Sequence, residues 1–105
     1  MSDATSLMGK NVVVTGAAQG VGLGIVEELL SQGANVGMLD RDGETLSASA
    51  EKASATGGGT VVSFATDVTD ADGVRSAFAT ACEQLGPLDG LVNNAGIIRM
   101  GAASE

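Results

Sequence analysis

An apolar run, a glycine-rich loop and a helical pattern follow one another between Asn11 and Gly33, and this succession constrains the fold most. Residues 11–14 are rich in valine, which is typical of a strand buried on both faces of a parallel sheet. The loop carries glycines at positions 16, 20 and 22. Gly33 is placed to end a helix. The apolar residues before it recur at helical spacing: Val21, Ile25, Val26, Leu29 and Leu30.

The same alternation continues along the chain. Residues 35–39, 61–65 and 91–92 are short apolar runs that predict three further strands. The first intervening segment predicts a helix that begins near Gly43 after a capping Asp42, and the glycines at 57–59 end it. Its apolar stripe is thin: Leu46, Ala50 and Ala53.

The second intervening segment predicts a helix with a clear core-facing stripe. Thr69 and Asp72 have the spacing of a capping box at its start. Gly86-Pro87 ends it. A lone cysteine falls on the stripe and is therefore expected to be an inert packing residue. The stripe residues are Val74, Ala77, Phe78, Ala81, Cys82 and Leu85.

Strands that alternate with helices indicate parallel pairing through right-handed crossovers. We therefore predict an α/β fold, an incomplete Rossmann-type doubly wound parallel sheet with strand order 3-2-1-4 and three helices. With 105 residues the chain has the length of one domain. Residues 1–8 are expected to be a flexible N-terminus, and residues 9–105 the domain itself.

Composition excludes several classes of partner. The net charge is −8 and the five basic residues are scattered, so no basic patch is expected for nucleic acid or anionic lipid. No apolar run approaches the ~20 residues of a membrane span. The opening residues do not have the pattern of a signal peptide. A single cysteine without histidine offers neither an intrachain disulfide nor a metal site, and it suits a reducing cytoplasm.

The glycine loop has the composition of a phosphate cradle. A parallel strand delivers the chain to the sheet edge where the next helix presents unpaired N–H groups and a partial positive charge. That arrangement suits a pyrophosphate, and side chains would block its approach. The spacing here is G-x-x-x-G-x-G rather than the common G-x-G-x-x-G, and no Lys-Ser/Thr pair follows as in a P-loop.

An acidic residue follows the second predicted strand. Asp40 lies where a carboxylate would bond the ribose diol of a dinucleotide. Because a carboxylate there repels a 2′-phosphate, the sequence favours NAD over NADP. Gln19 adds no positive charge in the loop, whereas Arg41, beside Asp40, offers a cation that could accept the extra phosphate.

Three motifs, each at the end of a predicted strand, resemble those of the short-chain dehydrogenase/reductase family. They are "TGAAQGVG" at residues 15–22, "DV" at residues 67–68 and "NNAG" at residues 93–96. The likeness extends from about residue 9 to residue 100. By this resemblance the loop wraps the pyrophosphate, Asp40 holds the adenosine ribose, and the later motifs contact the adenine, a ribose and the nicotinamide side. The implied cofactor-binding residues are Gly16, Gln19, Gly20, Val21, Gly22, Asp40, Arg41, Asp67, Val68, Asn93, Ala95 and Gly96.

The resemblance also implies chemistry that this sequence does not carry. The family uses a Tyr-x-x-x-Lys pair with a serine and an asparagine further along, and the sequence has no tyrosine. We therefore assign no catalytic residue and expect the domain to be cut short before the catalytic segment. An intact enzyme would transfer hydride between NAD and an alcohol or carbonyl substrate. The 105 residues alone should not turn over.

Two alternatives stay open. The chain could be a non-catalytic module that binds NAD or dimerises, since the open edge of the fourth strand invites pairing with a second copy. It could instead be a methyltransferase-like domain that binds S-adenosylmethionine, which also places a glycine loop after the first strand. The "NNAG" motif and the Thr-Gly opening argue against the methyltransferase reading.

Overall fold

The computed structural model of the chain describes residues 7–55 and 58–94. Within them four parallel strands form one sheet in the order β3-β2-β1-β4. The predicted Rossmann-type fold, strand order and helices are confirmed. The strands are β1 (Asn11–Thr15), β2 (Asn35–Asp40), β3 (Val61–Ala65) and β4 (Gly90–Asn93). The helices are α1 (Gly20–Ser31), α2 (Gly43–Ala55) and α3 (Ala71–Leu85).

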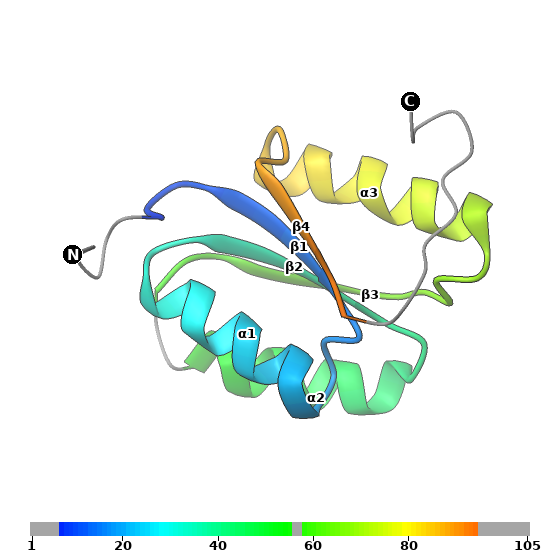
Figure 1. The fold of residues 1–105 in the computed structure, drawn as a ribbon, viewed down its shortest axis with the longest axis horizontal. Coiled ribbons are helices and arrows are strands. Elements are labelled where there is room, and N and C mark those ends of the chain that lie inside the picture. Colours follow the sequence, from blue (N-terminus) through cyan, green and yellow to red (C-terminus); the bar gives the residue numbers. More distant parts are fainter. Residues whose placement is uncertain (1–6, 56–57, 95–105) are drawn as a thin grey trace.

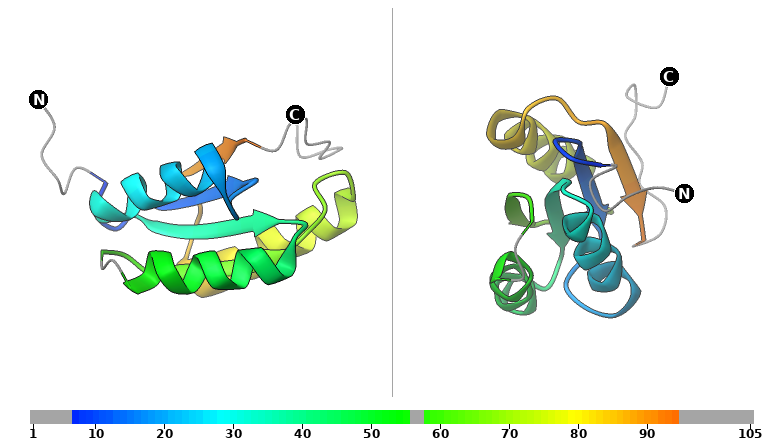
Figure 2. Two further views of the ribbon diagram at one scale, coloured as in Figure 1. Left: turned by 90° about the horizontal axis from the view of Figure 1, so that it is seen from below. Right: turned by 90° about the vertical axis from the view of Figure 1, so that its left-hand side faces the viewer.

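The molecule has three layers (Figure 1). Figure 2 shows α1 and α2 together on one face of the sheet and α3 on the other. Successive side chains of a strand point to opposite faces, so both faces need apolar residues. Val12 and Val14 accordingly pack in the cluster with α1 and α2, whereas Val13 packs with Ala77 and Ala81 of α3.

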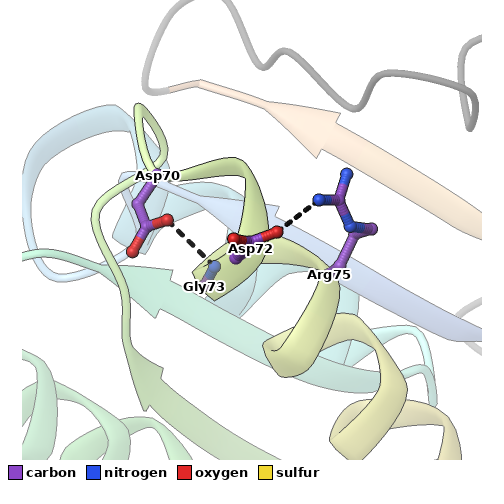
Figure 3. Close-up of polar contacts among 4 residues, drawn as sticks. All are labelled: Asp70, Asp72, Gly73 and Arg75. Carbon is purple, nitrogen blue, oxygen red and sulfur yellow. Dashed lines mark hydrogen bonds and ion pairs between the residues drawn. The ribbon is translucent and has the colours of Figure 1, made fainter.

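The first turn of α3 corrects one prediction from the sequence. Thr69 and Asp72 do not form a capping box there. Asp70 is the N-cap, and its Oδ1 accepts from the N–H of Gly73 at 3.2 Å (Figure 3). The cap predicted for α2 is found as expected: Asp42 Oδ1 accepts from Thr45 N–H at 3.2 Å.

The outer face of α3 corrects another. Cys82 is exposed rather than buried on the core-facing stripe. The buried residues of α3 are Val74, Ala77 and Ala81, and Phe78 packs partly buried against the same cluster. The neighbouring ion pair between Asp72 and Arg75 is also on the surface (Figure 3). Exposed pairs of this kind contribute little to stability.

Side-chain amides join the amino ends of the strands. Asn11 and Asn35 are opposite one another in the register of β1 and β2, and Asn35 Nδ2 donates to Asn11 Oδ1 at 2.9 Å. Asn11 Nδ2 donates to Pro87 O at 2.9 Å, just before β4, and Thr60 N–H, just before β3, donates to Asn35 Oδ1 at 2.8 Å. The two amides therefore link the starts of all four strands and fix their register.

The link through Asn11 gives a testable expectation. Asn11→Ala removes the partner of both Asn35 Nδ2 and Pro87 O, and leaving such groups unpaired should lower the free energy of unfolding by about 1–3 kcal/mol. Urea denaturation followed by circular dichroism measures the loss. Glu83→Ala, at an exposed position of α3, is the control and should stay within about 0.5 kcal/mol. Equal midpoints for both variants would show that the amide link adds no stability.

Candidate cofactor-binding site

The carboxyl ends of β1, β2 and β3 surround a small hollow. Its volume is about 160 Å³. Complete small-molecule sites occupy roughly 300–1,000 Å³, so this hollow accommodates one part of a larger ligand. The sequence had placed five of its lining residues in one site, and the fold brings them together. The lining residues are Gly16, Asp40, Arg41, Thr66, Asp67, Val68 and Thr69.

Beside the hollow the glycine loop brings helix α1 against the end of β1. A Cβ on Gly22 would lie only 1.9 Å from the carbonyl oxygen of Gly16, a backbone atom that has no room to move aside. Gly20 is required for a different reason: its φ is +63°, although the space around it is open. The two glycines therefore serve close approach and backbone turn respectively.

The N-terminus of α1 has no side-chain cap. Gln19 is its N-cap residue, in extended conformation, and makes no capping hydrogen bond. The N–H groups of the first turn therefore lack intrahelical partners. Aspartates cap the other two described helices, so the open donors at α1 distinguish this end. They carry the partial positive charge of the helix dipole and suit an anion.

Val21 lies in this first turn and is 72% exposed. The helical spacing had included it in the apolar face of α1, and that part of the prediction is wrong. The residues of α1 that are buried are Gly22, Val26 and Leu30. Val21 is instead exposed to solvent at the uncapped N-terminus of α1.

Three hydrogen bonds to β2 and α2 hold the glycine loop. Ala17 N–H donates to Leu39 O at 3.1 Å, and Ala18 N–H donates to Asp40 Oδ2 at 3.1 Å. The Ser49 hydroxyl, on α2, donates to Ala18 O. Sequence reasoning assigned Ser49 no role. The available signal was its spacing, since position 49 lies three residues after Leu46 and four before Ala53, on the same stripe.

Asp40 thus has a task within the protein as well as a place in the hollow. Its other oxygen, Oδ1, accepts from Asp42 N–H at 3.1 Å. A carboxylate offers about four acceptor positions, so the hydrogen bonds from Ala18 N–H and Asp42 N–H leave capacity for a ligand's hydroxyl groups. Arg41 is exposed on the rim of the same hollow.

Asp67 lies on the β3 side of the hollow with its carboxylate ordered by the next turn. Its Oδ1 accepts from Thr69 N–H at 2.9 Å and from Thr69 Oγ1 at 2.7 Å. These bonds, the N–H first and the hydroxyl second, hold the pKa of the Asp67 carboxyl below its ordinary value against the opposing effect of desolvation. The charge of Arg41 lowers this pKa further. The carboxyl is therefore ionised, an acceptor only, at neutral pH.

Thr15 and the two asparagines tie the end of β4 to the end of β1. Thr15 is fully buried; its Oγ1 donates to Asn93 Oδ1 at 3.1 Å and accepts from Asn94 N–H at 2.9 Å. Asn94 Nδ2 donates to Gly16 O at 3.3 Å. Asn93, predicted to contact a cofactor ribose, here bonds Thr15. Neither Thr15 nor Asn94 is among the predicted cofactor-binding residues, although they lie within the "TGAAQGVG" and "NNAG" motifs.

The predicted positions Ala95 and Gly96 lie outside the described residues. In the part of the chain that is described, no group of three or more His, Cys, Asp or Glu side chains is placed to hold a metal ion. The described helices also include none with the length and apolar character needed to cross a membrane.

The close contact of Gly22 predicts opposite effects for two substitutions in one helix. Gly22→Ala forces α1 away from Gly16 and should destabilise by about 1–3 kcal/mol, as overpacking does. Gly24→Ala meets nothing within 4 Å and should stabilise by about 0.5–1 kcal/mol, since alanine favours helix. Thermal and urea unfolding of both variants measures this. The same sign of change for both would refute the close contact.

The ordering of Asp67 predicts a pKa change on removal of one hydroxyl. Thr69→Val loses the Oγ1 bond and keeps the N–H bond, so the pKa of Asp67 should rise without reaching its ordinary value. Carboxyl ¹³C titration by NMR measures it, with Thr80→Val on α3 as control. A carboxyl whose pKa is lower in the folded than in the unfolded state adds to the free energy of unfolding, and this contribution is lost as pH falls through the folded-state pKa. Because the pKa shift is smaller in Thr69→Val, the free energy of unfolding should fall less on acidification than in the wild type. An unchanged pKa would contradict the assigned hydrogen bond.

Comparison with known proteins agrees with this geometry. The sequence profile described as short chain dehydrogenase matches residues 10–105. Gluconate 5-dehydrogenase of Gluconobacter oxydans is 38% identical over 103 residues, which cover 98% of this chain and 40% of the relative. 2-(S)-hydroxypropyl-CoM dehydrogenase 3 of Xanthobacter autotrophicus is 38% identical over 94 residues, covering 90% of this chain and 36% of the relative.

Solved structures show the same likeness. A short chain dehydrogenase from Mycobacterium smegmatis has a TM-score of 0.86 and 34% identity, with 92% of this chain and 41% of that chain covered. The structure of NAD⁺-bound xylitol dehydrogenase has a TM-score of 0.82 and 29% identity, covering 88% and 35%. The chain therefore spans less than half the length of each of these relatives. With its parallel sheet, glycine loop and matching profile, the chain belongs to the short chain dehydrogenase family.

Proposed function

We propose that this chain binds NAD, with the pyrophosphate at the N-terminus of α1 and the adenosine half across the ends of β2 and β3. The observation that carries the proposal is the first turn of α1, which has no side-chain cap and begins at Gly20, where the space around the Cα is open. An anion there would satisfy N–H donors that Gln19, the N-cap residue, leaves without a side-chain acceptor. Gly16, Gln19, Gly20, Val21 and Gly22 form this cradle.

The adenosine half has matching acceptors. Asp40, with acceptor capacity to spare, would bond the ribose diol, and an ionised Asp67 would accept from the adenine amino group beside Val68. Asn93, Ala95 and Gly96 would lie toward the other ribose and the nicotinamide. The donors at α1 and the acceptors at β2 and β3 thus match the anionic and hydroxyl-bearing parts of a dinucleotide.

Charge supports NAD over NADP. A 2′-phosphate placed at the ribose would lie against the Asp40 carboxylate. Asp67 lines the same hollow, and Asp42 is two residues from Asp40 and hydrogen-bonded to it. Among the described residues, Arg41 is the one cation that lines this hollow, and the nearby negative charge of Asp67 offsets part of its positive charge. The local balance is therefore negative, which penalises an added phosphate dianion.

The intact protein is proposed to be an oxidoreductase acting on an alcohol or carbonyl substrate. The relatives named above are dehydrogenases, and the nicotinamide of bound NAD supplies the chemistry of hydride acceptance. The residues of this chain bind and orient the cofactor. They include no tyrosine, and we assign none of them a catalytic role. Binding without turnover, the alternative class, is what the 105 residues alone should show.

Two further expectations remain proposals. A cytoplasmic location is supported by Cys82, an exposed lone thiol of the kind that persists in reducing compartments. Pairing of two copies through β4 is supported by the place of β4 at one edge of the described sheet and by Leu91, which is 46% exposed there.

Calorimetric titration of the chain, shown to be folded by circular dichroism, tests the proposed cofactor. NAD should bind more tightly than NADP, and S-adenosylmethionine should give no heat. Asp40→Asn keeps an oxygen that can accept from Ala18 N–H but removes the negative charge. The ratio of the dissociation constant for NADP to that for NAD should therefore fall about tenfold.

Arg41→Ala is the matched control at the adjacent position, and it should widen the same preference. No heat up to millimolar NAD, or tighter binding of NADP, would overturn the proposal.

A further inference from the structure

Ser49 is unusual among the buried residues. It is only 9% exposed, and of the three buried polar side chains in the described part it is the one on a helix, the others being Asn11 and Thr15 on β1. It shares the inward stripe of α2 with the buried Leu46 and Ala53. An alanine would pack in that stripe equally well, and a buried hydroxyl is costly unless it is hydrogen-bonded.

The hydroxyl of Ser49 hydrogen-bonds to the glycine loop. A helical serine commonly bonds the carbonyl four residues back on its own helix. Ser49 instead donates to Ala18 O, a backbone oxygen 31 residues away in sequence, in the loop before α1. Ala18 itself is only 2% exposed, so this contact is internal and lies behind the face that the loop presents to a ligand.

The residue that receives this bond is held on both sides. Ala18 N–H donates to Asp40 Oδ2, while Ala18 O accepts from Ser49 Oγ. The next residue, Gln19, is the N-cap of α1, and Gly20 begins the helix. The orientation of Ala18 therefore sets the direction in which the chain enters α1. It thereby also sets the direction in which the unpaired N–H groups of the first turn of α1 point.

We propose that Ser49 is a positioning residue for the pyrophosphate: it fixes the glycine loop from α2 so that the N-terminal N–H groups of α1 are aligned before the cofactor arrives. This inference rests on the proposed function. A group that orders a loop beforehand lowers the cost of ordering it on binding, so its effect should appear in affinity for the part of the ligand that the loop contacts.

The test compares two ligands that share the adenosine half. ADP carries a pyrophosphate and adenosine does not. In Ser49→Ala the dissociation constant for ADP should rise about three- to tenfold, while that for adenosine stays within about twofold. NMR titration measures both, including millimolar constants. Ser47→Ala, the same substitution at an exposed position of the same helix, is the matched control and should leave both constants unchanged.

A second readout needs no ligand. Amide hydrogen exchange at Ala17, Ala18 and Leu23, whose N–H groups are hydrogen-bonded around the glycine loop, should accelerate in Ser49→Ala. It should stay unchanged at Gly73 in α3, whose N–H donates to the capping Asp70. Should alanine unfold the chain, the pair Ser49→Thr and Ser49→Val replaces it, because these side chains have the same shape and differ in the hydroxyl. Threonine should then bind ADP at least threefold more tightly than valine, with adenosine equal.

The outcomes separate the two proposals. Suppose that the wild-type chain binds ADP and NAD, and that Ser49→Ala weakens the binding of ADP and adenosine equally or leaves both unchanged. Ser49 then only stabilises the fold, so this inference is wrong while the proposed function stands. If the wild-type chain binds neither ADP nor NAD, the proposed function fails and the inference fails with it. Selective loss of ADP affinity together with faster exchange at Ala17, Ala18 and Leu23 supports both.

Discussion

The contact between Gly22 and the carbonyl oxygen of Gly16 is the constraint from which the proposed site follows. A side chain at position 22 would overlap that oxygen, so only glycine lets α1 begin this close to the end of β1. The helix start is thereby placed at the carboxyl edge of the sheet, where the ends of β2 and β3 also lie. Backbone N–H groups and acidic side chains are then arranged along one edge of the sheet, and we propose that they serve as donors to phosphate and acceptors from sugar and base.

Side chains from other elements hydrogen-bond to the loop. Asp40 at the end of β2 and Ser49 on α2 fix Ala18 from two sides, and Asn94 after β4 reaches Gly16 O. The glycines provide the room, and these polar side chains remove the freedom that glycine would otherwise bring. The proposed site therefore depends on several elements packed together. In the sequence it is indicated by the glycine loop, by Asp40 and Arg41, and by the "DV" and "NNAG" motifs.

Patterns that depend on neighbours in the chain were predictable. Strand and helix periodicity, the cap at Asp42 and the strand order follow from local spacing and from the handedness of crossovers. Local competition misled the prediction at α3, where Asp70 lies one residue after Thr69 and caps the helix instead. At Cys82 the periodicity implied burial on the core-facing stripe, whereas the side chain is exposed in the fold.

Long-range pairings were beyond sequence reasoning. Ser49 and Thr15 read as an ordinary helical serine and a strand-end threonine, because their partners lie 31 and 78 residues away. The dual engagement of Asp40 was equally hidden: its position indicated a ribose acceptor, and only the folded chain shows that the same carboxylate holds Ala18. In the proposed complex Asp40 would therefore connect the position of the loop to the binding of the ribose.

A crystal structure of the chain with NAD tests the central claim most directly. The account predicts pyrophosphate oxygens within hydrogen-bonding distance of the N–H groups at the start of α1, and the adenosine ribose against Asp40. A nucleotide bound elsewhere on the molecule, or one whose phosphates leave those N–H groups unpaired, would contradict it.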